Sequence, residues 1–157
     1  MNGENTSYTQ SVTGVVLRDG RVLLARHTYG AGKGLLIVPG GYINIGETPQ
    51  DALCREYLEE TGVTVKPGRV IAIRFNSRDW YVAFAAEYVS GEAVSDGDEN
   101  DEVVWLPIGE ALTRDDVPPL TKRLIECAMR PEAGFDLIPY ESREKHGAYS
   151  LYGTAAI

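Results

Sequence analysis

Two apolar runs near the N-terminus predict a pair of strands. Valine and leucine dominate residues 12–17 and 22–25, and Asp19-Gly20 lies between the two runs. Because Asp-Gly is a strong signal for a two-residue hairpin turn, we expect the runs to pair as antiparallel strands.

The following residues alternate between loop and strand signals. Residues 27–34 contain three glycines and predict a loop. The apolar segment 35–38 predicts a short strand, which we expect to end at the Pro-Gly-Gly sequence 39–41. Three later apolar runs predict further strands, at 70–75, 80–89 and 103–106. We expect a turn at 76–79 between the first two of these later strands.

A helix is predicted at 49–61 by signals at both of its ends. Thr48 suits the N-cap position, Pro49 suits the first helical turn, and Asp51 stands three residues after the cap. Gly62 provides the helix stop, because glycine readily adopts the left-handed conformation that ends many helices.

The order of the elements predicts an α/β or α+β sandwich. A short helical turn is expected at 107–109 and an amphipathic helix at 121–129. We divide the chain into a flexible N-terminus at 1–11, one domain at 12–130 and a C-terminal tail at 131–157. The tail is rich in tyrosine, leucine and isoleucine, so we expect it to pack on the domain or on a second subunit as a dimer arm.

Composition narrows the class of protein. The chain has 157 residues, of which 43% are hydrophobic and 24% charged, values typical of a globular domain. Its net charge of −8 argues against general nucleic-acid binding. Two cysteines are too few for a disulfide framework or a zinc site. No apolar run is long enough to span a membrane, and residues 1–10 lack the apolar core of a signal peptide, so we expect a cytoplasmic protein.

The predicted helix carries a cluster of acids. At about 100° per residue, one stripe is apolar and consists of Leu53, Cys54, Tyr57 and Leu58. Glu56, Glu59 and Glu60 share a face that we expect to be roughly opposite this stripe. Like charges at this spacing destabilise a helix by about a few tenths of a kcal/mol per pair. The cluster is therefore either a solvated surface or a site for a hard cation such as Mg²⁺ or Mn²⁺.

Residues 41–63 decide between these two interpretations, because they resemble the signature of the Nudix hydrolase family. That signature is Gly, five residues, Glu, seven residues, then Arg-Glu-x-x-Glu-Glu-x-Gly followed by an aliphatic residue. Its fixed positions here are Gly41, Glu47, Arg55, Glu56, Glu59, Glu60 and Gly62. Seven such identities arise by chance at a frequency of roughly 10⁻⁸ to 10⁻⁹ per starting position. Tyr57 departs from the family's aliphatic preference, and we expect its ring to be buried with its hydroxyl hydrogen-bonded or at the rim.

The resemblance implies a fold, a reaction and a set of metal ligands. The implied fold is an α/β/α sandwich with a mixed central sheet. The implied reaction is metal-dependent hydrolysis, with Mg²⁺ or Mn²⁺, of the pyrophosphate in a nucleoside diphosphate linked to another moiety. Carried over from the family, the metal ligands are Glu56, Glu59, Glu60, the Gly40 carbonyl and, as a weak or indirect ligand, Glu47. Arg55 would orient these carboxylates.

The general base is less narrowly defined by the resemblance. Family members often take it from a loop acid ahead of a late tryptophan, which here is Trp105. We favour Glu99, and Glu102 or one of the helix glutamates are the alternatives. The predicted catalytic set is thus Glu56, Glu59, Arg55 and Glu99.

Substrate contacts are predicted from charge and from aromatic character. The cationic candidates for phosphate binding are Arg26, Lys33, Arg74 and Arg78, each of which competes with an ordinary surface role. Tyr29, Phe75, Trp80 and Tyr81 are the candidates for stacking on a base, and Tyr81 is the one we favour.

Two substrate classes and two rival functions stay open. The substrate is a small nucleotide, either a nucleoside triphosphate removed by a clean-up enzyme or a dinucleotide polyphosphate. The alternative function is a non-catalytic Nudix-fold module that binds a nucleotide and regulates. A third hypothesis, an acidic interaction domain that uses residues 92–102, has no specific support. We also expect a homodimer through the tail.

Overall fold

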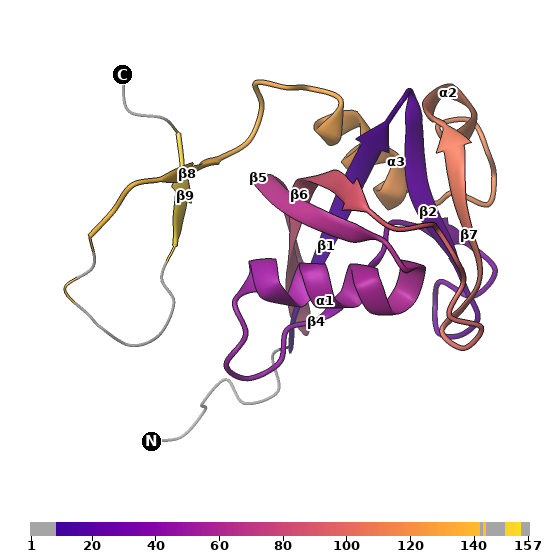
Figure 1. Cartoon of the computed structure of the whole chain (residues 1–157), viewed down its shortest axis with the longest axis horizontal. Coiled ribbons are helices and arrows are strands. Elements are labelled where there is room, and N and C mark those ends of the chain that lie inside the picture. The colour runs from indigo at the N-terminus through magenta and orange to yellow at the C-terminus, as the bar shows by residue number, and fades with distance from the viewer. Residues whose placement is uncertain (1–8, 142, 144–149, 155–157) are drawn as a thin grey trace.

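Seven strands form one mixed sheet with helices on both of its faces (Figure 1). The computed structural model describes residues 9–141, 143 and 150–154. The strands of the sheet are β1 (Thr9–Arg18), β2 (Arg21–His27), β3 (Leu36–Ile37), β4 (Gly40–Tyr42), β5 (Thr64–Phe75), β6 (Asp79–Ser90) and β7 (Asn100–Pro107). The helices are α1 (Pro49–Thr61), α2 (Ile108–Ala111) and α3 (Pro119–Ala128). The strand order is β3-β2-β1-β6-β5, with β4 paired to β1 and β7 paired to β2.

The predicted N-terminal hairpin is confirmed. Strands β1 and β2 pair antiparallel, with Arg18 opposite Arg21. Asp19 and Gly20 both have positive φ, of 50° and 72°. Positive φ at both central residues matches the twist of the flanking strands, which explains the Asp-Gly pair at this turn.

Strand β1 pairs with β2, β4 and β6. Along one edge it pairs in parallel with β6 from Thr9 to Val16. Along the other edge it pairs with β4 at residues 11–13 and with β2 at residues 17–18. The predicted strand at 35–38 corresponds to β3 and ends before residues 39–41 as expected, but Gly40 and Gly41 also begin β4, which the sequence pattern did not predict. Strand β4 pairs with residues of β1 that lie 27 to 31 positions earlier in the sequence, and local sequence patterns do not predict such a tertiary contact.

The predicted helix at 49–61 is confirmed, including both caps. The hydroxyl of Thr48 accepts the backbone N–H of Asp51 at 3.2 Å. Gly62 has φ 74° and donates its N–H to the carbonyl of Leu58. The buried tyrosine is also as predicted, since Tyr57 is fully buried and its hydroxyl donates to the Gly14 carbonyl at 2.6 Å.

The predicted apolar stripe of α1 was wrong at one position. Leu58 is 55% exposed, whereas Glu60 is 5% exposed. At about 100° per residue, Glu60 lies about 20° from Leu53 and Leu58 lies about 140° away from it. The buried face of α1 therefore includes an acid, and the three glutamates do not share one solvent face.

Two apolar clusters lie on opposite faces of the sheet and give three layers. One cluster joins α1 to the sheet and includes Leu53, Tyr57, Val12, Val82 and Phe84. The other joins α2 and α3 to the sheet and includes Ala111, Ile125, Val15, Leu24 and Ala83. Since neighbouring strand residues point to opposite faces, Val15 and Val16 contribute to different clusters. The α/β/α sandwich with a mixed sheet is confirmed.

The later elements follow the predicted order with longer strands. Asn76 forms the expected turn between β5 and β6, where its side-chain oxygen accepts the N–H groups of Arg78 and Asp79. The predicted helical turn at 107–109 corresponds to α2, and the helix at 121–129 corresponds to α3, which begins two residues earlier.

The described part of the tail forms a small antiparallel sheet that the sequence pattern did not predict. Its strands are β8 (Asp136–Ile138) and β9 (Leu151–Gly153). Phe135 and Val70 exchange two backbone hydrogen bonds, and Tyr152 packs edge-on against Phe84 with ring centroids 5.6 Å apart. These residues of the tail therefore contact the domain of the same chain.

The predicted flexible N-terminus lies mostly outside the described residues. Residues 1–8 belong to that undescribed part, and residues 9–11 are the first residues of β1. None of the helices within the described ranges is long and apolar enough to cross a membrane.

Candidate active site

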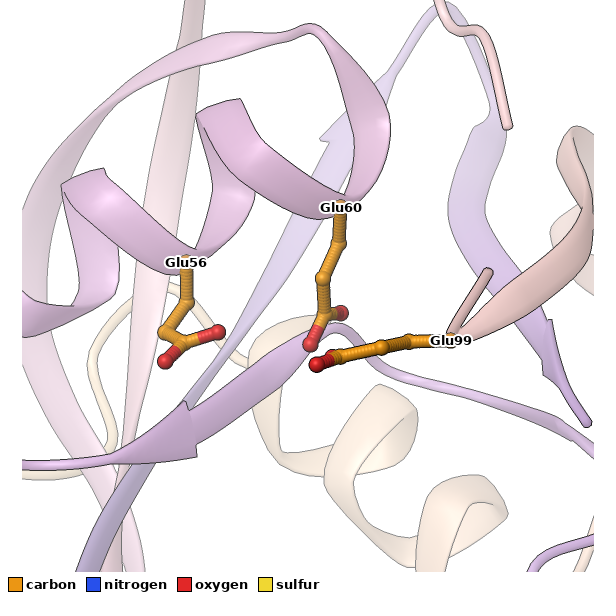
Figure 2. Close-up of side chains that lie close together, drawn as sticks. All are labelled: Glu56, Glu60 and Glu99. Carbon is orange, nitrogen blue, oxygen red and sulfur yellow. The ribbon is translucent and has the colours of Figure 1, made fainter. Parts of the chain in front are cut away.

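Three glutamates from two distant parts of the chain meet beside β4. Glu56 and Glu60 lie on successive turns of α1, and Glu99 precedes β7 (Figure 2). Their side chains point toward one another, and one carboxylate oxygen from each lies within 4.8 Å of those of the other two. The loop before β7 thus adds a third acid to the pair on the helix.

Glu60 is the most strongly perturbed member of this group. It is 5% exposed, and its Oε2 atom is buried with no hydrogen-bond partner among the described residues. Burial raises the pKa of Glu60 to about 8, and the carboxylates of Glu56 and Glu99 contribute in the same direction. The backbone N–H of Gly40, which the carboxylate accepts, opposes this shift. A group of three carboxylates that includes a buried oxygen without a hydrogen-bond partner fits a hard divalent cation.

Glu56 is held in place by Arg55 and by the absence of a side chain at Gly41. The guanidinium of Arg55 donates to Glu56 Oε1 at 2.8 Å. A Cβ atom at Gly41 would lie 2.5 Å from Oε1 and 2.7 Å from Oε2 of Glu56. Burial raises the pKa of Glu56, and Arg55 works against this rise. The signature glycine therefore provides the space that the Glu56 carboxylate occupies.

Arg55 joins the loop before α1 to the helix. It donates twice to the carboxylate of Glu47, at 2.6 and 3.0 Å, and at 3.1 Å to the carbonyl of Tyr42. A fourth contact reaches Glu59 at 3.3 Å. These hydrogen bonds hold the pKa of Glu47 below its usual range. Glu47 and Glu59 thus contact Arg55 in this structure and lie outside the group formed by Glu56, Glu60 and Glu99.

A cleft of about 830 Å³ extends from these carboxylates. Its polar lining includes Arg55, Glu56, Glu59, Glu60 and Glu99. Its apolar and aromatic lining includes Tyr29, Leu35, Ile37, Tyr42, Tyr81, Leu120 and Leu124. The cleft therefore has charged and apolar parts, as the site of an amphipathic ligand such as a nucleotide requires.

A comparison with models of protein families identifies the family of the chain. The family model described as "NUDIX domain" matches residues 8–126, which is most of the chain. The chain belongs to the Nudix family. The family predicted from the seven fixed positions of residues 41–62 is therefore confirmed.

Relatives and solved structures of the Nudix family agree with this assignment. The chain is 35% identical over 117 residues to the NAD-capped RNA hydrolase NudC of Escherichia coli O1:K1 / APEC. That alignment covers 71% of this chain and 44% of NudC, so the chain spans less than half the length of this relative. The prediction of a Nudix-type enzyme is confirmed at the level of the family, whose named relatives are hydrolases.

Two solved structures show the same fold. A NUDIX hydrolase from Nitrosomonas europaea superposes with a TM-score of 0.71 at 21% identity, covering 80% of this chain and 74% of that one. An ADP-ribose pyrophosphatase from Streptococcus suis 89-1591 superposes with a TM-score of 0.63 at 22% identity, covering 80% and 95%.

The Nudix cleft contains two of the five predicted substrate-binding residues. Arg74 and Tyr81 line it, and the guanidinium carbon of Arg74 lies 4.6 Å from the centre of the Tyr81 ring. Arg74 also donates to Asp79 at 2.5 Å. Lys33 and Arg78 are exposed and do not belong to the described lining of the cleft.

Arg26 is also absent from the cleft lining, and its contacts explain why. It donates to Glu102 at 2.9 Å, to Asp116 at 3.1 Å and to the carbonyl of Gly34 at 2.7 Å. These bonds join β2, β7 and the loop before α3. They also occupy the carboxylate of Glu102, which leaves Glu99 as the loop acid that lies beside Glu56.

Among the aromatic candidates, Tyr29 lines the cleft as Tyr81 does, and Phe75 and Trp80 are not part of the described lining. Sequence reasoning missed His27, which also lines the cleft and stacks on Tyr29 with ring centroids 6.0 Å apart. It also missed Asn100, a buried amide directly after Glu99. The one signal for Asn100 in the sequence was its position directly after Glu99, the candidate general base.

Proposed function

We propose that this Nudix chain is a divalent-cation-dependent hydrolase that cleaves the pyrophosphate of a nucleoside diphosphate linked to another moiety. The observation that carries the proposal is the unpartnered Oε2 of buried Glu60, a residue whose carboxylate is grouped with those of Glu56 and Glu99. In its ionised form such a carboxylate is costly to bury unless a positive charge is supplied.

Glu56 and Glu60 are the proposed principal holders of Mg²⁺ or Mn²⁺. A bound divalent cation polarises phosphoryl oxygens and lowers the pKa of a coordinated water. Glu59, Glu47 and the Gly40 carbonyl are proposed as further ligands on the strength of the family pattern. For Glu47 and Glu59 this role requires release from Arg55, which both contact in this structure.

Glu99 is the proposed general base, and Arg55 is the proposed orienting residue. The Glu99 side chain is exposed at the cleft, so its carboxylate can accept the proton of an attacking water, whereas Glu56 is half-buried and Glu60 is buried. Arg55 contacts Glu56 and Glu47 together, and its planar guanidinium keeps the Glu56 carboxylate in one orientation.

The substrate is proposed to be a nucleotide whose phosphates lie near the carboxylates and whose nucleoside lies along the apolar lining. Arg74 is the proposed phosphate contact, because it lines the cleft. A nucleoside triphosphate and a dinucleotide polyphosphate are the two classes that the sequence favours. The NAD-capped RNA hydrolase named among the relatives adds an NAD-type dinucleotide. A cytoplasmic location and a homodimer through the tail are also part of the proposal.

The test is phosphate release from a panel of nucleoside triphosphates, dinucleotide polyphosphates, ADP-ribose, NADH and nucleotide sugars. Each substrate is assayed with a coupling phosphatase, with and without Mg²⁺ or Mn²⁺. Glu60→Gln is the blank, and Glu126→Gln is the matched control, because Glu126 pairs with Arg123 on α3 away from the cleft. We expect metal-dependent turnover of one class, lost in the first variant and kept in the second. Nucleotide binding without turnover in the parent chain would instead support the non-catalytic module.

A further inference from the structure

Hydrogen bonds attach the segment that carries Glu99 both to α1 and to the loop after β2. Its first attachment is the N–H of Val94, which donates to the carbonyl of Thr61 at the end of α1 at 2.9 Å. Two further attachments lie directly beside Glu99 and involve Asn100 and Thr28.

Asn100 connects the chain next to Glu99 to the backbone of Glu60. Its side chain is 1% exposed, and its Nδ2 donates to the carbonyl of Glu60 at 2.8 Å. The carbonyls in the last turn of a helix have no partner within the helix, so this carbonyl is free to accept a side-chain donor. One hydrogen bond therefore joins the residue after Glu99 to the backbone of Glu60. Figure 2 shows that the carboxylate of Glu60 faces that of Glu99.

Thr28 holds the same segment from the opposite side. Its backbone N–H and its hydroxyl both lie 3.1 Å from the carbonyl oxygen of Glu99, and the hydroxyl lies 2.7 Å from the carbonyl oxygen of Asp98. Thr28 follows the end of β2, where the pairing with β7 shifts register. The Glu99 backbone thus lies between a contact to α1 and a contact to the loop after β2.

The buried amide of Asn100 uses only part of its hydrogen-bonding capacity. Its Oδ1 atom is buried and has no hydrogen-bond partner in the described part of the chain. An unpaired buried acceptor destabilises the folded state. The hydrogen bond that caps α1 therefore does not by itself explain an amide at this position. A role in fixing the distance between Glu60 and Glu99 would explain why the hydrogen bond from Nδ2 to the Glu60 carbonyl is made at this cost.

We propose that Asn100, assisted by Thr28, is a positioning residue that sets where Glu99 lies relative to the carboxylates of α1. This inference rests on the proposed function, in which Glu99 acts beside a cation held by Glu56 and Glu60. Asn100 itself is buried and is not part of the described lining of the cleft. Its effect on turnover and on cation binding passes through Glu99.

The experiment is a double-mutant cycle with Asn100→Ala and Glu99→Gln, read out by kcat, KM and Mn²⁺ affinity. Tyr57→Phe is the matched control, because it removes another buried hydrogen bond from α1 to a backbone carbonyl, away from Glu99. Thermal unfolding without metal measures the stability of each variant. Thr28→Val is the second variant, which removes one hydroxyl near Glu99 with little change in size.

We expect Asn100→Ala to lower kcat by about 10- to 100-fold with KM changed by less than about threefold, a loss typical of a misplaced catalytic group. In the Glu99→Gln background the same change should have no further effect on kcat or on Mn²⁺ affinity. Thr28→Val should act in the same direction and more weakly. Tyr57→Phe should lower stability and leave kcat unchanged.

Independent, multiplicative effects of the two changes would overturn the proposal, as would a kcat for Asn100→Ala equal to that of Tyr57→Phe. If Asn100→Ala does not fold, an unchanged kcat in Thr28→Val overturns it as well. Full activity in Glu99→Gln would instead refute the proposed role of Glu99. If the parent chain lacks turnover, the proposed function fails, and the cycle in Mn²⁺ affinity still decides whether Asn100 acts through Glu99.

Discussion

Two adjacent glycines in β4 should respond in opposite ways to the same substitution. Neither Gly40 nor Gly41 has positive φ, so alanine at either position meets only a steric obstacle. At Gly41 the obstacle is the end of the Glu56 side chain, with its oxygens 2.5 and 2.7 Å from the added Cβ. At Gly40 the obstacle is backbone, with Thr13 Cα at 2.8 Å and the Val12 carbonyl oxygen nearer still.

The magnitudes follow from which atoms can move. An ordinary contact of a Cβ atom is about 3.5 Å, so Gly41→Ala displaces the Glu56 carboxylate by about 1 Å. A misplacement of this size costs about 100-fold in turnover, whereas rotating the end of one flexible side chain costs only about 1 kcal/mol of stability. Gly40→Ala must separate β4 from β1, an overpacking that costs about 1–3 kcal/mol or more. For a chain of this size that lowers Tm by about 2–4 °C per kcal/mol.

The assay compares Tm, kcat and Mn²⁺ affinity for the two variants and the parent chain. Gly41→Ala should keep Tm within about 3 °C and lose activity and Mn²⁺ affinity together, while Gly40→Ala should show the larger loss of Tm. If Gly41→Ala retains most of its turnover, the Glu56 carboxylate is not needed where the structure places it. If both variants unfold alike, the distinction between side-chain and backbone obstacles is wrong.

Three further predictions concern charge. The pKa of Glu60 is raised to about 8 in the folded state, so its contribution to stability is complete below about pH 4.5 and is lost as pH rises through 8. Without metal, Glu60→Gln should therefore be more stable than the parent by about 2–4 kcal/mol at pH 9 and similar to it at pH 4.5. Urea unfolding in EDTA measures this difference, and equal unfolding curves of the two proteins at both pH values would contradict it. Arg55→Lys should lower kcat by at least about tenfold, because a lysine cannot bond to Glu47 in the same two-point manner; an unchanged kcat in steady-state assays would remove its orienting role. Arg26→Ala should lower Tm by several degrees and leave KM for the nucleotide unchanged, since Arg26 contacts Asp116 outside the cleft; a raised KM with unchanged Tm would restore it as a substrate contact.

Local rules account for the parts of this protein that the sequence determined. The bounds of α1 follow from Thr48, Pro49 and Gly62, because helix ends are decided by hydrogen bonds and φ values within a few residues. The Asp19-Gly20 hairpin follows for the same reason. The family follows from seven residues at fixed spacing between Gly41 in β4 and Gly62 at the end of α1. The α/β/α layers follow from that family, and the order of the elements predicts an α/β or α+β sandwich.

Tertiary contacts decided the rest, because they join residues whose separation no local pattern records. Glu60 is buried since the sheet and the Glu99 segment cover the end of α1, although its residue type predicts exposure. Glu99 and Glu102 both precede Trp105 in the sequence, and the fold separates their roles. Glu99 precedes β7 and lies beside Glu56 and Glu60, whereas Glu102 lies within β7 and accepts a hydrogen bond from Arg26, 76 residues away. The sequence by itself therefore determined the family and the acids to consider, and only the tertiary structure decided which of them face one another.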